Sequence, residues 1–129
     1  MTTLTVQTSQ REEMVDITSR VAQVVAESGI DSGFVFCYVP HTTAGITINE
    51  AADPDVRRDI IDKLHRAFPE KDGYRHAEGN SDAHLKTSLI GSAVDVMIED
   101  GKLVLGRWQG IFFCEFDGPR SRRVLLRIC

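Results

Sequence analysis

Short segments with the two-residue period of a β-strand recur along this 129-residue chain, and several are separated by turns too short to contain a helix. Residues 94–98 and 103–105 are joined by Glu99-Asp100-Gly101, a strong hairpin signal. Residues 111–116 and 124–128 form a second strand pair. Strands joined by hairpins are antiparallel, so the pattern excludes a helical bundle and disfavours a doubly wound parallel sheet.

The remaining elements complete an α+β pattern of seven or eight strands and three helices in one domain, residues 1–129. Further strands are predicted at residues 3–8, 14–17, 33–39 and 44–49. Helices are predicted from Asp16 or Thr18 to Gly29, from Asp53-Pro54 to Phe68, and from Asn80, Ser81 or Asp82 to Leu89. The second helix has the clearest start, because a capping aspartate precedes a proline at its first position.

The pattern of apolar residues also predicts which faces are buried. Residues 33–39 are apolar on both faces, which is typical of a central strand. In the third helix, Leu85 and Leu89 are expected to face the core, which would leave His84 on the loop side. The buried stripe of the second helix is predicted to be Val56, Ile60, Ile61, Leu64 and Phe68, and core packing is predicted for Phe112, Phe113 and Phe116.

Composition limits the classes of protein to which the chain can belong. It is 42% hydrophobic and 26% charged, as in a soluble globular domain, and it has no apolar run of the ~18 residues that cross a membrane. The first residues lack the features of a signal peptide, and the three cysteines have no CxxC spacing. We therefore expect a cytoplasmic protein with reduced thiols and no membrane partner.

The net charge of −4 is unevenly distributed, because residues 102–129 contain six basic and two acidic side chains. An acidic chain with one basic end is a poor general binder of nucleic acid. A small anionic metabolite or phosphorylated substrate held by two or three arginines fits this distribution better. Ordinary arginines on a strand surface are an equally simple interpretation.

Three histidines stand in two short polar stretches, residues 41–50 (HTTAGITINE) and 76–84 (HAEGNSDAH). His41 directly follows a buried strand, whereas His76 and His84 flank a loop that leads into the third helix. Three imidazoles with one open position suit a divalent metal, zinc above all. For any single histidine, a hydrogen bond to the backbone is the simpler interpretation, but the three together favour a metal site.

Other side chains near these stretches have both functional and structural interpretations. Glu50 is a candidate base or orienting group for a ligand histidine, or simply a solvated strand end. Asp82 fits a helix cap better than a catalytic acid. Trp108, beside a glycine, is a candidate wall for a pocket that holds a flat ring, or a partly buried structural tryptophan. His65 lies on the polar face of its helix and is expected at the surface.

The two histidine stretches, together with residues 85–89 (LKTSL) and 108–120 (WQGIFFCEFDGPR), resemble one family over essentially the whole chain. It is the secondary thiamine-phosphate synthase family, or YjbQ-like proteins. The resemblance implies an α+β fold of two packed, mostly antiparallel sheets, and a homotrimer with a metal site at the subunit boundaries. Carried over, the metal ligands are His41, His76 and His84. The implied pocket neighbours are Glu50, Asn80, Asp82, Trp108 and Arg120.

The resemblance implies a transferase that couples hydroxymethylpyrimidine diphosphate to thiazole phosphate and releases diphosphate. In that reaction Arg120 would pair with phosphate and Trp108 would stack on a ring. Two alternatives stay open at this stage. The same histidines would also serve a metal-dependent hydrolase of a phosphorylated or cyclic metabolite, with Glu50 or Asp82 activating water. A non-catalytic module that binds a small anionic metabolite is the third hypothesis.

Overall fold

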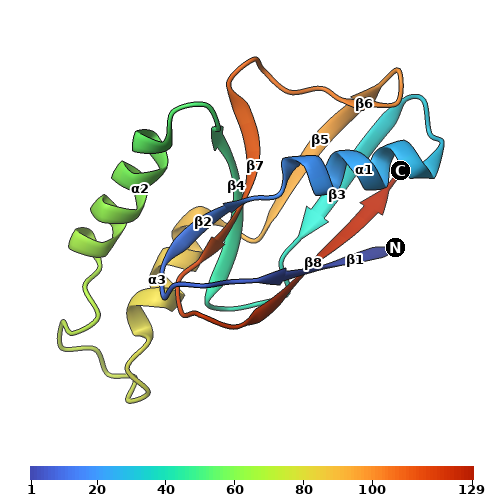
Figure 1. The fold of residues 1–129 in the computed structure, drawn as a ribbon. Coiled ribbons are helices and arrows are strands. Elements are labelled where there is room, and N and C mark those ends of the chain that lie inside the picture. Colours follow the sequence, from blue (N-terminus) through green and yellow to red (C-terminus); the bar gives the residue numbers. More distant parts are fainter.

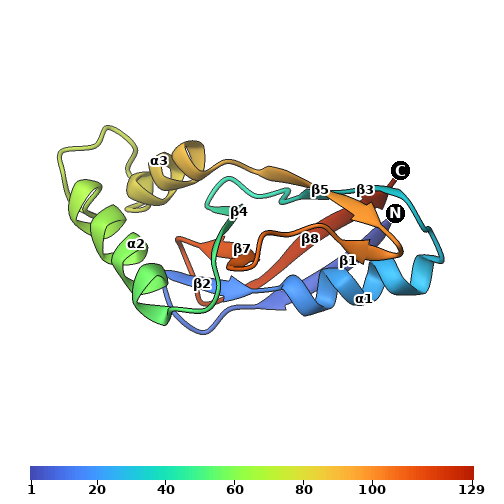
Figure 2. The same ribbon diagram turned by 90° about the horizontal axis from the view of Figure 1, so that it is seen from above.

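The computed structural model describes all 129 residues and contains two antiparallel sheets and three helices (Figures 1 and 2). The strands are β1 (Thr2–Gln7), β2 (Glu13–Asp16), β3 (Gly33–Tyr38), β4 (Ala44–Glu50), β5 (Ala93–Glu99), β6 (Lys102–Leu103), β7 (Gln109–Glu115) and β8 (Ser121–Ile128). The helices are α1 (Thr18–Ser28), α2 (Pro54–Ala67) and α3 (Ser81–Ile90). Five strands form one sheet in the order β1-β8-β3-β5-β6, and three form the other in the order β2-β7-β4. The predicted α+β architecture is confirmed.

The main core lies between the two sheets and is closed on one side by α1. Its 16 buried residues come from both sheets and from α1, and they include Val35, Cys37, Val96, Ile111, Phe113 and Leu126. Each fully buried aliphatic or aromatic side chain contributes about 1.5–3 kcal/mol relative to an exposed one. This core therefore fixes how the sheets are stacked, and none of its residues comes from the segment 51–80.

A smaller core covers the other face of the three-stranded sheet. Met14, Ala83, Phe112, Cys114 and Phe116 are buried there, beneath α2 and α3. The apolar stripe of α2 was predicted to be buried, but it is only partly buried, because no residue of α2 is fully buried. The helix lies along one end of the molecule, where only part of its stripe reaches the sheet (Figure 2). The core positions predicted for the three phenylalanines of residues 112–116 are confirmed.

Helix α3 spans the predicted residues, but the face that it buries is not the predicted one. Leu85 and Leu89, expected in the core, are 42% and 64% exposed, whereas Asp82 and Lys86 are fully buried. The polar face turns inward because Asp82 and Lys86 have charged partners in the loop between β1 and β2. The exposed face of α3 therefore carries Leu85 and Leu89, and Leu85 directly follows His84.

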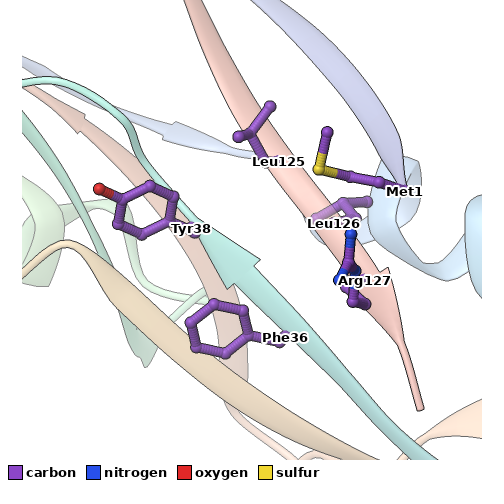
Figure 3. Close-up of a pocket in the computed structure, with 6 residues that line it drawn as sticks. All are labelled: Met1, Phe36, Tyr38, Leu125, Leu126 and Arg127. Carbon is purple, nitrogen blue, oxygen red and sulfur yellow. The ribbon is translucent and has the colours of Figure 1, made fainter.

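Strand β3 is central in its sheet, as predicted, but only one of its faces is covered. Phe34, Phe36 and Tyr38 point outward and are 38–41% exposed, next to the exposed Met97 of β5. A hollow of about 180 Å³ lies on this face. Figure 3 shows the six side chains that line it: Met1, Phe36, Tyr38, Leu125, Leu126 and Arg127. We call the outward side of the five-stranded sheet the open sheet face.

Local features explain where the elements end. Asp53 accepts a hydrogen bond from the Asp55 amide and caps α2, with Pro54 in its first turn. Gly29 ends α1 with a left-handed backbone (φ 73°), as predicted. A Cβ at Gly45 would lie 2.5 Å from the carbonyl oxygen of Gly91, so β4 needs glycine where it passes the end of α3. No helix is both long enough and apolar enough to span a membrane.

Candidate functional site

His76 and His84 lie together at the start of α3. Their ring centres are 5.5 Å apart and the ring planes are nearly perpendicular, at 89°. The two rings border a surface hollow of about 560 Å³ that is also lined by Tyr74, Arg75, Ser81 and Ser88. The carboxylate of Glu78 lies 3.9 Å from His76 Nε2. The loop and the first turn of α3 thus bring the two histidines of one sequence stretch to one accessible place.

The spacing of this pair fits two ligands of one metal ion. With zinc–nitrogen bonds of about 2.1 Å and tetrahedral angles, two imidazole ring centres lie roughly 5 Å apart. The chain contains no group of three or more His, Cys, Asp or Glu side chains suited to hold a metal. The structure therefore brings together two of the three histidines predicted as ligands, and His41 is not among them.

His41 lies apart from this pair and has a different environment. It follows β3, and its Nε2 accepts a hydrogen bond of 3.0 Å from the backbone N–H of Arg123 in β8. Partial burial, with the positive charges of Arg122 and Arg123, lowers the pKa of His41. The ring is therefore neutral at pH 7, and its Nε2 already accepts a hydrogen bond.

Asn80 and Arg120 are brought together through one carboxylate. The Asn80 amide donates to Asp117 Oδ2 at 3.0 Å, and the Arg120 guanidinium donates to the same oxygen at 3.1 Å. Arg120 Nε also donates to the carbonyl oxygen of Asp117 at 3.0 Å. Asp117 thus joins the residue before α3 to the turn between β7 and β8. It holds the half-exposed Arg120 near the start of α3.

Asp82 is enclosed in a group of charged residues that we call the α3 anchor: Arg11, Glu12, Asp82 and Lys86. Arg11 donates to both Asp82 oxygens at 3.1 Å, and Lys86 Nζ donates to Asp82 at 2.7 Å and to Glu12 at 2.5 Å. Burial alone would raise the pKa of Asp82, but the hydrogen bonds from Arg11 and Lys86 outweigh it and lower the pKa. The side chain makes no capping bond and is fully buried, so it is placed to orient α3 rather than to contact a substrate.

A second buried ion pair lies beneath His41. Glu115 accepts hydrogen bonds from Arg122 Nε at 2.9 Å, the Thr8 hydroxyl at 2.8 Å and the Asp117 amide at 3.1 Å. Arg122 also donates to the Thr43 hydroxyl at 2.9 Å, two residues after His41. Burial would raise the pKa of Glu115, but the bonds from Arg122, the Asp117 amide and Thr8 lower it. The pair ties the loop after β3 to the start of β8.

Glu50 and Trp108 lie at the opposite end of the three-stranded sheet. Ala44 pairs with Glu115 and Glu50 pairs with Gln109, so the two ends are separated by six residues, roughly 20 Å of strand. Trp108 is 55% exposed, and the Arg107 guanidinium lies 4.8 Å from its ring centre. The structure therefore places these two predicted residues near each other, at the far end of β4 and β7 from the Asp117–Arg120 turn.

Comparison with known proteins now identifies the family, because the family description "UPF0047 protein YjbQ-like" matches residues 2–129. The chain belongs to the UPF0047 family of YjbQ-like proteins. It is 50% identical over 127 residues to the UPF0047 protein YugU of Bacillus subtilis, covering 98% of this chain and 96% of YugU. It is 53% identical over 123 residues to MJ1081 of Methanocaldococcus jannaschii, covering 95% and 89%. A crystal structure of a YjbQ/UPF0047 protein from Clostridium acetobutylicum matches with a TM-score of 0.98 at 52% identity, covering both chains completely.

Apart from Asp82, the charged groups of the two buried clusters beside the histidines were not singled out from the sequence. Asp82 and Lys86 are four residues apart on a helix, a spacing at which side chains meet. In β8, Arg122 lies two residues before Val124 and four before Leu126, so the two-residue period places it on the same buried face. Both signals were present in the sequence, but neither showed that partners for these charges would lie in the N-terminal loop and in β7.

The lowered pKa values of Asp82 and Glu115 make stability dependent on pH. Since both are lower in the folded UPF0047 chain than in an unfolded one, the unfolded chain takes up protons first as the pH falls. We expect these two carboxylates to leave the free energy of unfolding nearly unchanged between pH 7 and 5 and to decrease it below roughly pH 4, whereas the lowered pKa of His41 decreases it separately as the pH falls below about 6.5. Urea unfolding between pH 3 and 7 measures this dependence. In the double variant Asp82→Asn plus Glu115→Gln, the free energy of unfolding should depend less on pH below pH 4. An equally steep decrease in that variant would contradict the assignment.

Proposed function

We propose that the chain forms a homotrimeric enzyme in which His76 and His84 hold a divalent metal, with zinc preferred, at a subunit boundary. The proposed activity is the coupling of hydroxymethylpyrimidine diphosphate to thiazole phosphate. A bond forms between the pyrimidine methylene carbon and the thiazole nitrogen, and the carbon–oxygen bond to diphosphate breaks. The observation that supports this proposal best is the pair of perpendicular imidazoles, 5.5 Å apart, in an accessible hollow.

The residues around the hollow suit phosphorylated compounds. Arg75 lines it with the Ser81 hydroxyl, and both groups can donate hydrogen bonds to anionic oxygens, whereas the Ser88 hydroxyl already donates to the His84 carbonyl oxygen. Asp117 holds Arg120 near the start of α3, where it can pair with a phosphate. A bound divalent ion would offset part of the negative charge of the departing diphosphate. The α3 anchor keeps His84 oriented toward this hollow, so Asp82 acts as a positioning residue in this proposal.

Two uncovered apolar surfaces support a trimer. The open sheet face exposes Phe34, Phe36, Tyr38 and Met97, and α3 exposes Leu85 and Leu89 beside His84. Contiguous exposed apolar side chains of this kind are typical of protein interfaces. A closed ring of three subunits joins two different surfaces of each subunit, so residues that are distant within one chain can meet. Glu50 and Trp108 are proposed to reach the histidine pair of a neighbour in this way.

His41 is the third ligand of the sequence-based set. It can complete the site only from a neighbouring subunit, because the subunit itself brings no third ligand to the pair. It would also have to give up the hydrogen bond from Arg123, since that bond uses the lone pair of Nε2.

Elemental analysis of the purified protein tests the metal site. We expect about one metal per chain in the wild type, lost in His76→Ala and in His84→Ala while the trimer persists in light scattering. His65→Ala is the matched control, because His65 is exposed on α2 outside the hollow, and its one partner, Glu12, keeps its bond to Lys86. Wild-type metal content in His84→Ala would refute the ligand assignment.

Incubation with both substrates tests the reaction itself. We expect the wild type to form thiamine phosphate and diphosphate in equal amounts, and His84→Ala to form neither above background. Release of phosphate or diphosphate without thiamine phosphate would refute the coupling reaction and point to hydrolysis.

A further inference from the structure

The environment of His41 follows from the way in which β3 ends. Strand β3 pairs with β8 only from Val35–Ile128 to Tyr38–Leu125, and Pro40 then turns the chain away. Strand β8 begins earlier, at Ser121, so its first residues have no β3 partner on that side. The backbone N–H of Arg123 would lack an acceptor there, and His41 Nε2 provides one at 3.0 Å. The imidazole thus replaces a missing hydrogen bond of the sheet.

This bond determines which ring nitrogen carries the proton. An N–H can donate only to a nitrogen with a free lone pair, so Nε2 is unprotonated and the proton of the neutral ring is on Nδ1. A metal-bound neutral imidazole uses the lone pair of one nitrogen and keeps the proton on the other. In His41 the lone pair is occupied and the other nitrogen is protonated, so neither nitrogen is available to a metal.

The Nδ1–H group is free to donate. His41 makes no other hydrogen bond within the chain, and Nδ1 is not among the buried atoms that lack a partner. The side chain lies near three arginines, of which Arg122 is neutralised by Glu115, whereas Arg123 is exposed and Arg120 is half exposed. A donor in positively charged surroundings suits an anionic oxygen rather than a cation.

We infer that His41 is not a metal ligand but a hydrogen-bond donor, which presents Nδ1–H to an oxyanion such as a phosphoryl group. Arg122 and Glu115 are the positioning residues, because their buried pair holds Thr43 and the start of β8 and so fixes both ends of the His41–Arg123 bond. This inference rests on the proposed function for its metal, which His76 and His84 would hold, but the proton position of His41 holds without that function.

Nitrogen NMR of the wild-type protein labelled with ¹⁵N-histidine tests the proton position directly. With metal removed, we expect His41 to show a protonated Nδ1 and an unprotonated Nε2 at pH 7.5. One equivalent of zinc should shift the nitrogens of His76 and His84 and leave those of His41 unchanged. A protonated Nε2, or a zinc-induced shift of His41 as large as those of the other two, would overturn the inference.

Two variants separate the nitrogens of His41. In His41→Asn the side-chain amide N–H takes the place of Nδ1–H, whereas in His41→Gln the amide oxygen can replace Nε2 as the acceptor. Both variants should keep the wild-type metal content. Affinity of the metal-free protein for inorganic phosphate, measured by calorimetry, should fall about tenfold in His41→Gln and change less than about threefold in His41→Asn, because one bond to a charged group is lost only in the former.

The outcomes distinguish this inference from the proposed function. Loss of metal in both His41 variants would overturn the inference and support the hypothesis that all three histidines bind the metal. Unchanged phosphate affinity in His41→Gln would overturn the donor role. Absence of metal from the wild type would refute the proposed metal site, while the tautomer and phosphate measurements would still decide the role of His41.

Discussion

Replacing Glu115 by alanine is expected to lower the free energy of unfolding by about 3–5 kcal/mol, because the change leaves the Arg122 guanidinium buried without its carboxylate. Glu115 is fully buried and Arg122 is 3% exposed, so water cannot replace the lost partner. The Thr8 hydroxyl and the Asp117 amide would lose their acceptor as well. Urea unfolding at pH 7 measures the effect.

Glu99→Ala is the matched control for this change. Glu99 is exposed at the end of β5, and its one side-chain contact is a 3.4 Å hydrogen bond from Ser32, so the expected change is within about 0.5 kcal/mol. The double variant Glu115→Ala with Arg122→Met removes both charges and should be more stable than the sum of the two single changes predicts. A cost below about 1 kcal/mol for Glu115→Ala would contradict the burial of this pair.

Replacing Lys86 by methionine is expected to lower the free energy of unfolding by about 3 kcal/mol, because Glu12 and Asp82 would then share the charge of Arg11, which also pairs with Glu70. Lys86 is fully buried and bonds to both Glu12 and Asp82. Methionine keeps most of the side-chain length, so the change removes charge rather than volume. The cost should appear in the free energy of unfolding. At the metal site proposed for His76 and His84, the affinity should also fall, because α3 carries His84.

A second substitution shows whether charge balance is the cause. Adding Glu12→Gln to Lys86→Met leaves one cation and one carboxylate in the α3 anchor and should recover part of the lost stability. Arg58→Ala is the control, since Arg58 and its partner Asp55 are both more than 70% exposed and such a pair contributes little. If the double variant is less stable than Lys86→Met alone, the imbalance of charge is not the reason.

The elements of this fold could be predicted from the sequence because each has a local signal. The capping residues Asp53 and Gly29 mark helix ends, and the turn at Asp100 and Gly101 has positive φ at both positions, as its hairpin requires. The face of α3 could not be predicted in this way. Its inward orientation depends on Arg11 and Glu12, which are about 70 residues away in the chain.

The candidate site was predictable in part for the same reason. His76 and His84 come from one stretch and meet through a short loop, so their proximity follows from local sequence. The place of His41 depends on where the ladder between β3 and β8 ends, which is a property of the sheet register. Glu50 lies at the far end of its strand because β4 runs the length of the three-stranded sheet. Spacing in the sequence carries no information about either.

The segment between β4 and α3, residues 51–80, supplies His76 and much of the hollow but no residue of the core between the two sheets. Its helix, α2, has no fully buried residue. Substitutions in the loop between α2 and α3 would therefore alter the lining of the hollow without removing a side chain from the core between the two sheets. The lining of the hollow can therefore vary in this stretch of chain without any change in the side chains that hold the two sheets together.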